Sequence, residues 1–280
     1  MSEILGKQPR VEPGHLTEIP NAQAIRMRIW MPGLDEGFVP QGLAFADGRV
    51  LVAAYRSTSP RLSRGESRVF AIDAASGASV GQFKLPEDVG HPGGLAYDGE
   101  KHLFVADRGK LYRIDLQRAL ADGEVTNAIE GRADVDREIG PSYLAYHDRH
   151  LWFGPYEKHG EPRVYKMPVE VAFPKSGAAY LTAEDATASF AADVRVQGAA
   201  VDAHGFLWLS QSGSDGGAVR RHDPGSGALL DLFELMAGLE DLAFGPDGRL
   251  WSVSEAGSRR WRRWSTYYPL VFSVDVSKLR

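Results

Sequence analysis

Apolar and polar residues alternate with a period close to two along most of the chain, and this pattern returns five times. Each copy has a short apolar stretch, a turn that often carries Asp-Gly, and a second apolar stretch with a large side chain at one fixed place. A period of two is typical of β-strands, and Asp-Gly supplies the positive φ angle that a tight hairpin needs. Each copy therefore predicts a β-hairpin. The copies are PQGLAFADGRVLVAAY (40–55), PGGLAYDGEKHLFVADRG (92–109), PSYLAYHDRHLWFGPY (141–156), VQGAAVDAHGFLWLSQSG (196–213) and LEDLAFGPDGRLWSVSEAG (239–257).

The spacing of the copies predicts the architecture. Equivalent positions lie 43 to 55 residues apart, and a third strand that mostly ends on Asp follows each hairpin. Four-stranded units of this length bury both faces by stacking on their neighbours around a ring. We therefore expect an all-β fold, a five-bladed β-propeller of four-stranded antiparallel blades, with no amphipathic helix inside the repeats. Six blades would need a sixth copy of this hairpin, which the sequence lacks.

The two ends of the chain complete the expected ring. After the last hairpin there is room for three strands only, whereas residues 24–30 (AIRMRIW) form a strand with no partner nearby in the sequence. Pairing these segments would supply the missing fourth strand and remove an exposed sheet edge. We expect residues 1–22 to form an N-terminal arm and residues 23–280 a single propeller domain.

The pattern PxGLA(F/Y)xxDGxLxV(A/S), followed by a third strand ending in Asp, resembles the NHL-like gluconolactonase and strictosidine-synthase superfamily of β-propellers. The resemblance spans nearly the whole chain from about residue 24, although that superfamily typically has six blades. It implies an enzyme whose site lies at the top of the channel, a lactone or ester hydrolase for a small polar or anionic substrate. The alternative is a non-catalytic propeller that binds a ligand or a protein through the same face.

The second residue of each copy is expected to face the top of the central channel. In gluconolactonases this position carries divalent-metal ligands, so the resemblance implies one cation, calcium first, held by Glu240, Gln41 and Gln197. Calcium affinity follows the number of charged ligands, and only one member of this ring is charged. Metal-free chemistry is therefore the alternative. The ring consists of Gln41, Gly93, Ser142, Gln197 and Glu240.

Two side chains are candidates for acid–base catalysis. Glu240 would lie in a narrow channel among amides and aromatic rings, which should raise the pKa of its carboxyl toward neutrality. Its alternative role is to cap backbone amides at the channel mouth. His91 precedes the second copy at the same face, where it is either a base or an ordinary loop residue. Asp241 should point away from Glu240 by strand alternation and act as a structural hydrogen-bonding group.

Residues just after each second strand should form a rim around this ring. One rim loop departs from the repeat, because residues 254–269 (SEAGSRRWRRWSTYYP) interleave arginines with aromatic residues. We interpret this loop as a lid over an anionic ligand. A solvated loop or a subunit interface is the alternative. We expect substrate contacts from Gln41, Ser142 and Gln197 and from the rim residues Arg56, Asp107, Arg108, Tyr156, Gln211, Glu255, Arg259 and Trp261.

Composition narrows the classes of partner. The formal net charge is −5, which gives no general electrostatic reason to bind nucleic acid or an anionic membrane. The chain has no cysteine, so thiol nucleophiles and disulfides are excluded. No apolar segment resembles a signal peptide or a membrane span, and we expect a cytoplasmic protein whose partner is a small molecule.

Overall fold

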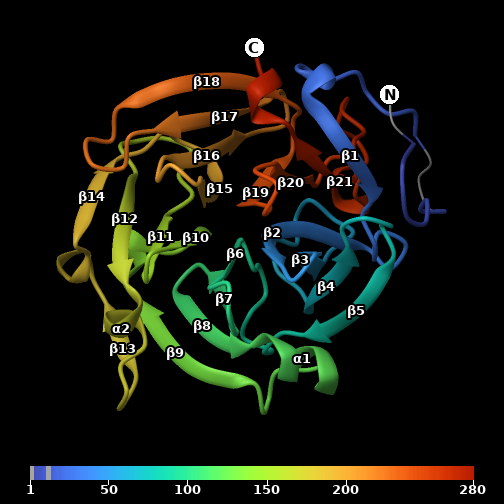
Figure 1. Cartoon of the computed structure of the whole chain (residues 1–280). Helices are drawn as coiled ribbons and strands as arrows, with labels where there is room; N and C mark the ends of the chain where they lie inside the picture. The colour runs from blue at the N-terminus through green and yellow to red at the C-terminus, as the bar shows by residue number, and fades with distance from the viewer. Residues whose placement is uncertain (1–2, 11–13) are drawn as a thin grey trace.

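Five β-sheets stand around a central axis in the computed structural model, which describes residues 3–10 and 14–280 (Figure 1). Each sheet contains four antiparallel strands, and the second sheet carries one additional strand. The innermost strands of neighbouring sheets lie side by side around the axis. The predicted five-bladed β-propeller is therefore confirmed.

The chain builds the first four blades in sequence order, from the axis outward. The first blade contains β2 (Phe38–Ala46), β3 (Arg49–Arg56), β4 (Ser67–Asp73) and β5 (Ser79–Lys84). The second contains β6 (Gly94–Tyr97), β7 (His102–Asp107), β8 (Lys110–Asp115) and β9 (Ile129–Val135). The third contains β10 (Tyr143–His147), β11 (His150–Gly154), β12 (Arg163–Pro168) and β14 (Ala188–Ala191). The fourth contains β15 (Val196–Val201), β16 (Leu207–Ser212), β17 (Gly217–His222) and β18 (Leu229–Leu235).

The fifth blade joins the two ends of the chain. It contains β19 (Leu239–Phe244), β20 (Leu250–Ser254), β21 (Leu270–Val274) and the N-terminal β1 (Ile25–Trp30). Strand β1 pairs antiparallel with β21, as the sequence predicts, and so closes the ring. Leu5, in the described N-terminal segment, forms a parallel bridge with Ile29 of β1.

Large side chains at the fixed position of the second strand pack between blades. Trp152, Trp208 and Trp251 are all buried, and each contacts an aromatic ring of its own or an adjacent blade. Trp208, for example, stacks on Phe233 and meets Phe244 edge-on. These contacts confirm that the tryptophans belong to the inter-blade core.

The innermost hairpins of the first, fourth and fifth blades contain a β-bulge. The pairing register shifts at Gln41, Gln197 and Glu240, which are three members of the predicted inner ring. A bulge leaves part of the hydrogen-bonding ladder unpaired and changes the direction of its side chains. Strict alternation therefore fails at the positions where the sequence suggests chemistry.

Three elements were not expected from the repeat. Helix α1 (Leu116–Asp122) follows β8, because the Asp115 carboxylate accepts a hydrogen bond from the Arg118 backbone N–H and caps the helix. In the sequence this Asp is one of those that end the third strand of a copy. A short helix α2 (Val169–Ala172) and strand β13 (Ala179–Leu181) lie between β12 and β14, and β13 pairs in parallel with β9 of the second blade.

No helix in the described part of the chain is both long and apolar enough to cross a membrane.

Candidate functional site

Asp241 occupies the axis where the innermost strands meet. The strands approach so closely that a Cβ atom on Gly198 would lie 2.4 Å from the Asp241 Cα. The Asp241 carboxylate accepts backbone N–H bonds from Leu43, Leu95 and Ala199 at 2.9–3.1 Å, and these residues belong to three other blades. The expected structural hydrogen-bonding role of Asp241 is confirmed, and its position joins four blades at the axis.

Two carboxyl groups lie beside each other near this point. Glu240 has 1% of its surface exposed and its Oε1 accepts a bond from the Gln197 amide at 3.2 Å. Glu255 follows β20 with 7% exposed, and its Oε2 accepts a bond from the Gln41 amide at 3.1 Å. The order Gln197, Glu240, Glu255, Gln41 forms a polar chain across the fourth, fifth and first blades.

The two carboxyl groups differ in their protonation. Burial, followed by the neighbouring Glu255 charge and a hydrogen bond with it, raises the pKa of Glu240 well above its usual range. Burial also raises the pKa of Glu255 to about 7, and interactions with Trp261, Glu240 and Gln41 oppose the rise. Glu240 is therefore the member of the pair that holds a proton more strongly, whereas Glu255 exchanges its proton near pH 7.

A cavity of about 690 Å³ opens above this pair at the top of the channel. Glu255 lines the cavity, but Glu240 does not and reaches it only through Glu255 and Gln197. The structure thus assigns the group that faces a ligand to Glu255, where the sequence favours Glu240. The cavity gathers eight of the predicted site residues, which are Gln41, His91, Arg108, Ser142, Tyr156, Gln197, Glu255 and Trp261.

Four predicted rim residues lie outside the cavity lining, and three of them, Arg56, Arg259 and Gln211, bind backbone carbonyls elsewhere. The Arg56 Nε donates to the Glu36 carbonyl at 3.0 Å, and Arg259 Nη2 donates to the Asp35 carbonyl at 2.7 Å. Both arginines therefore hold the turn that leads into β2. Gln211 donates to the Val194 carbonyl and accepts from an arginine of β17.

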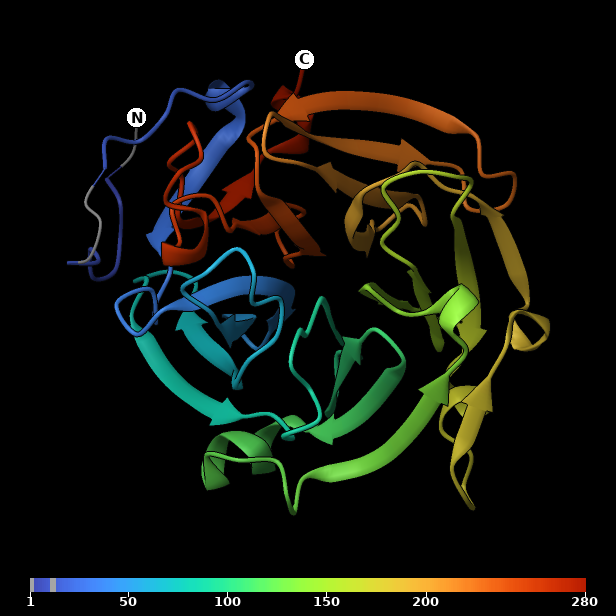
Figure 2. The same cartoon turned by 180° about the vertical axis from the view of Figure 1, so that it is seen from behind.

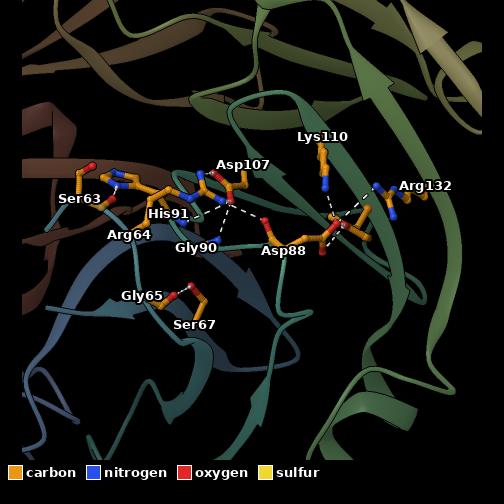
Figure 3. Close-up of polar contacts among 11 residues, drawn as sticks. Ser63, Arg64, Gly65, Ser67, Asp88, Gly90, His91, Asp107, Lys110 and Arg132 are labelled. Carbon is orange, nitrogen blue, oxygen red and sulfur yellow. Dashed lines mark hydrogen bonds and ion pairs between the residues drawn. The ribbon is translucent and has the colours of Figure 1, made fainter.

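Asp107, the fourth predicted residue outside the lining, fixes the loop that presents His91 (Figure 3). Its carboxylate pairs with Arg64 at 2.9 Å and accepts the backbone N–H groups of Gly90 and His91. Asp88, earlier in the same loop, pairs with Lys110 of β8. The loop is thus anchored to the second blade at both ends.

His91 also lines the cavity, as a neutral imidazole. Its Nδ1 donates to the Ser63 carbonyl at 2.5 Å, and its ring stacks on Tyr55 with centroids 4.5 Å apart. Burial lowers the pKa of His91, and the nearby Arg108 and Arg64 lower it further. Because Nδ1 carries the proton, Nε2 is the acceptor atom of the ring.

The sequence analysis expects arginines of this loop to meet an anion and singles out Arg259, but Arg260 is the one that lines the cavity. It belongs to a short 3₁₀ turn (Arg259–Trp261), which directs consecutive arginines to different sides. Its guanidinium lies over the rings of Trp261 and Tyr55, at 4.5 and 5.4 Å from their centroids. Its Nη2 reaches the Pro60 carbonyl of the first blade at 3.4 Å, so this loop (red in Figure 2) bridges the first and last blades.

The charge of the cavity lining differs from that of the whole chain. Trp261 stacks on Trp264, and both rings line the cavity beside Arg260. The acidic lining residues are Glu157 and Glu255. The basic ones, Arg108, Arg137, Lys158, Arg195 and Arg260, outnumber them on a protein with a net charge of −5. The lining favours an anion.

The predicted calcium ligands are not arranged for a cation. The amide nitrogens of Gln41 and Gln197 point at the carboxyl groups, which share a proton rather than present two free charges. Both Asp241 oxygens accept backbone N–H groups. Within residues 3–10 and 14–280, no cluster of three or more His, Asp or Glu is placed to hold a metal. This donor set does not fit a divalent cation.

Fold and site together define a five-bladed β-propeller with a carboxyl pair beneath a basic cavity. No protein-family model and no curated protein matches the sequence. Among solved structures, the glutaminyl cyclase of Myxococcus xanthus aligns with 93% of this chain and 94% of its own, at 14% identity and a TM-score of 0.55. A luciferin-regenerating enzyme aligns over 85% and 76%, at 14% identity and a TM-score of 0.44. At 14% identity the likeness to the Myxococcus xanthus structure shows the fold alone, and membership of the gluconolactonase group stays a prediction.

Proposed function

We propose that this propeller is an acid–base enzyme that hydrolyses an ester or lactone bond of a small anionic substrate, with Glu255 as the catalytic residue. The observation that supports the proposal is a pair of buried, hydrogen-bonded carboxyl groups of which one lines a basic cavity. Paired carboxyls with separated pKa values are a recurring arrangement for proton transfer near neutral pH.

Each proton has a place in the proposed reaction. Ionised Glu255 removes a proton from a water molecule, whose oxygen bonds to the substrate carbonyl carbon. The carbon–oxygen bond to the leaving group then breaks, and protonated Glu255 returns the proton to the leaving alkoxide. Protonated Glu240 donates a hydrogen bond to Glu255 and, with Gln41, orients its carboxylate. Tyr156 supplies a hydroxyl donor for the carbonyl oxygen, because burial raises its pKa and keeps it protonated.

The test is a screen of small esters and lactones that carry a free carboxylate, run with Glu255→Gln beside the wild type. We expect kcat to fall by about 10²- to 10⁴-fold, since this substitution removes the group that exchanges the proton. Glu157→Gln is the matched control, because Glu157 is an exposed acid on the same cavity. Equal activity in Glu255→Gln would overturn the assignment.

A second candidate function follows from a neighbouring cleft. A cleft of about 560 Å³ shares Arg195, Ser212 and Gly213 with the lining of the cavity and continues toward residues 17–20. This extension would accommodate a longer chain, such as a peptide. The solved propeller from Myxococcus xanthus is named a glutaminyl cyclase. Ring closure of an N-terminal glutamine, with release of ammonia, would use the same proton transfer by Glu255.

Peptides that begin with glutamine separate the two candidates. Ammonia release from such a peptide, without turnover of esters, would favour cyclisation over hydrolysis. If neither substrate class reacts while anions still bind, the propeller is a non-catalytic binding protein, and the enzyme proposal fails.

A further inference from the structure

Arg260 is a buried cation with unused hydrogen-bond donors. The residue is 7% exposed, and its Nε and Nη1 atoms have no hydrogen-bond partner among the described residues. Its Nη2 makes one long bond, 3.4 Å, to the Pro60 carbonyl. No ion pair joins Arg260 to an acid within the described chain, although the guanidinium lines the cavity.

Burial of an unpaired charge is costly, so this geometry needs a compensating partner. The Tyr55 and Trp261 ring faces supply part of the compensation through cation–π contacts. Such contacts occupy the faces of the planar guanidinium and leave the N–H groups on its edges unsatisfied. Burial lowers the pKa of Arg260, but arginine stays charged in proteins. An anion in the cavity would neutralise the Arg260 charge and accept hydrogen bonds from its unused N–H groups.

The shape of the surroundings favours a planar anion. The site lies between aromatic side chains, with Trp264 stacked behind Trp261 and His91 stacked on Tyr55. A carboxylate can lie in the plane of the guanidinium and accept its N–H groups in that plane. His91 is neutral, and no ion pair joins Arg260 to Glu255 among the described residues, so neither group supplies the missing charge.

We propose that Arg260 is the carboxylate-binding residue of the cavity, so that the ligand carries a free carboxylate group held between Tyr55 and Trp261. The inference deepens the proposed function, because it names the substrate class as carboxylate-bearing. The binding step itself requires no turnover, and it can therefore be tested separately from the reaction.

The test measures binding of acetate, succinate and monomethyl succinate at constant ionic strength. Intrinsic tryptophan fluorescence is the readout, because Arg260 lies against Trp261. We expect saturable binding of the carboxylates, at least about ten-fold weaker binding of the neutral dimethyl succinate, and a loss of at least about ten-fold in Arg260→Gln. Arg263→Gln, an exposed arginine of the same loop, is the matched control and should bind as the wild type does.

The variants also separate folding from binding. Arg260→Gln removes a buried unpaired charge, so its melting temperature should be equal to or above that of the wild type. Arg260→Lys keeps the charge without the planar donor set and should bind carboxylates with intermediate affinity. Retained carboxylate affinity in folded Arg260→Gln, equal affinity for the neutral diester, or tighter binding of inorganic phosphate than of any carboxylate would overturn the proposal. The same applies if no probe binds the wild type.

Failure of the two proposals can be distinguished. If carboxylates bind in a way that depends on Arg260 but no ester is turned over, the anion-binding proposal is supported and the hydrolase proposal is contradicted. The opposite outcome is turnover that depends on Glu255 and is equal for charged and neutral esters, both in the wild type and in Arg260→Gln. That outcome would support the hydrolase proposal and contradict the anion-binding proposal.

Discussion

Asp241 and Glu240 are adjacent acids of one inner strand, and both are buried, yet their partners differ in kind. Asp241 receives rigid backbone N–H groups from three other blades. Glu240 receives one side-chain amide and faces a second carboxyl group. Burial raises the pKa of both side chains; backbone N–H donors oppose the rise at Asp241, whereas the neighbouring Glu255 adds to it at Glu240. The difference separates a structural carboxylate at the axis from a proton-exchanging pair beneath the cavity.

The largest expected effect comes from removing a hydrogen-bond acceptor at the axis. Asp241→Asn places an amide N–H₂ against backbone N–H groups, so at least one buried donor loses its acceptor. We expect the free energy of unfolding to fall by about 3 kcal/mol or more, measured by urea denaturation. Asp215→Asn, on an exposed loop, is the control. An unchanged unfolding midpoint in Asp241→Asn would contradict the structural role.

The second effect is a dependence of stability on pH. The folded-state pKa of Glu255 is raised to about 7 from 4.5, so the folded protein binds more protons than the unfolded chain between these values. The contribution of this group is fully present below about pH 4.5 and is lost as pH rises through about 7, with a total of about 3 kcal/mol. Urea unfolding near pH 5 and near pH 8 should show this loss in the wild type and a smaller one in Glu255→Gln. Parallel pH profiles in the two proteins would refute it.

A third, smaller effect distinguishes positioning from catalysis. Because Glu240 is protonated and does not line the cavity, Glu240→Gln preserves a neutral donor beside Glu255. We expect Glu240→Gln to keep kcat within about three-fold of the wild type and Glu240→Ala to lower it by about ten-fold or more. The pH–rate midpoint of Glu240→Ala should also shift. A loss in Glu240→Gln as large as in Glu255→Gln would return the catalytic role to Glu240.

The smallest expected effect is that of chelation. The donors around the carboxyl pair do not fit a divalent cation, and therefore EDTA followed by dialysis should leave both the melting temperature and any ester turnover unchanged. Addition of calcium should have no effect either. A rise in melting temperature with calcium that disappears in Glu255→Gln would place a metal at the pair.

The repeat made most of the fold predictable. Five copies of one hairpin set the number of blades, and the unpaired strand at residues 24–30 indicated how the ring closes. Helix α1 was missed because an Asp at a strand end suits both a turn and a helix cap, and only the residues after it decide.

The sequence predicted where the candidate site lies, but it predicted less well which residue has which role. The repeat alignment identified the inner ring and the rim, and eight predicted residues line the cavity. It could not tell that bulges redirect the inner strands, or that Glu255 rather than Glu240 meets the cavity. The sequence could not single out Arg260 from Arg259, because the four arginines of this loop are equivalent in the sequence until a 3₁₀ turn gives each a direction.

The polar chain that holds Glu255 has a consequence for biogenesis. Gln41 and Glu255 are 214 residues apart in the chain, and their hydrogen bond spans the seam between the first and last blades. The chain must therefore have left the ribosome past Glu255 before the site can assemble. Contacts of such long sequence separation are slow to form, because the loop entropy is lost before they stabilise the fold. Ligand binding at this seam would report the completion of the ring, and a nascent chain or a truncated one would be inert.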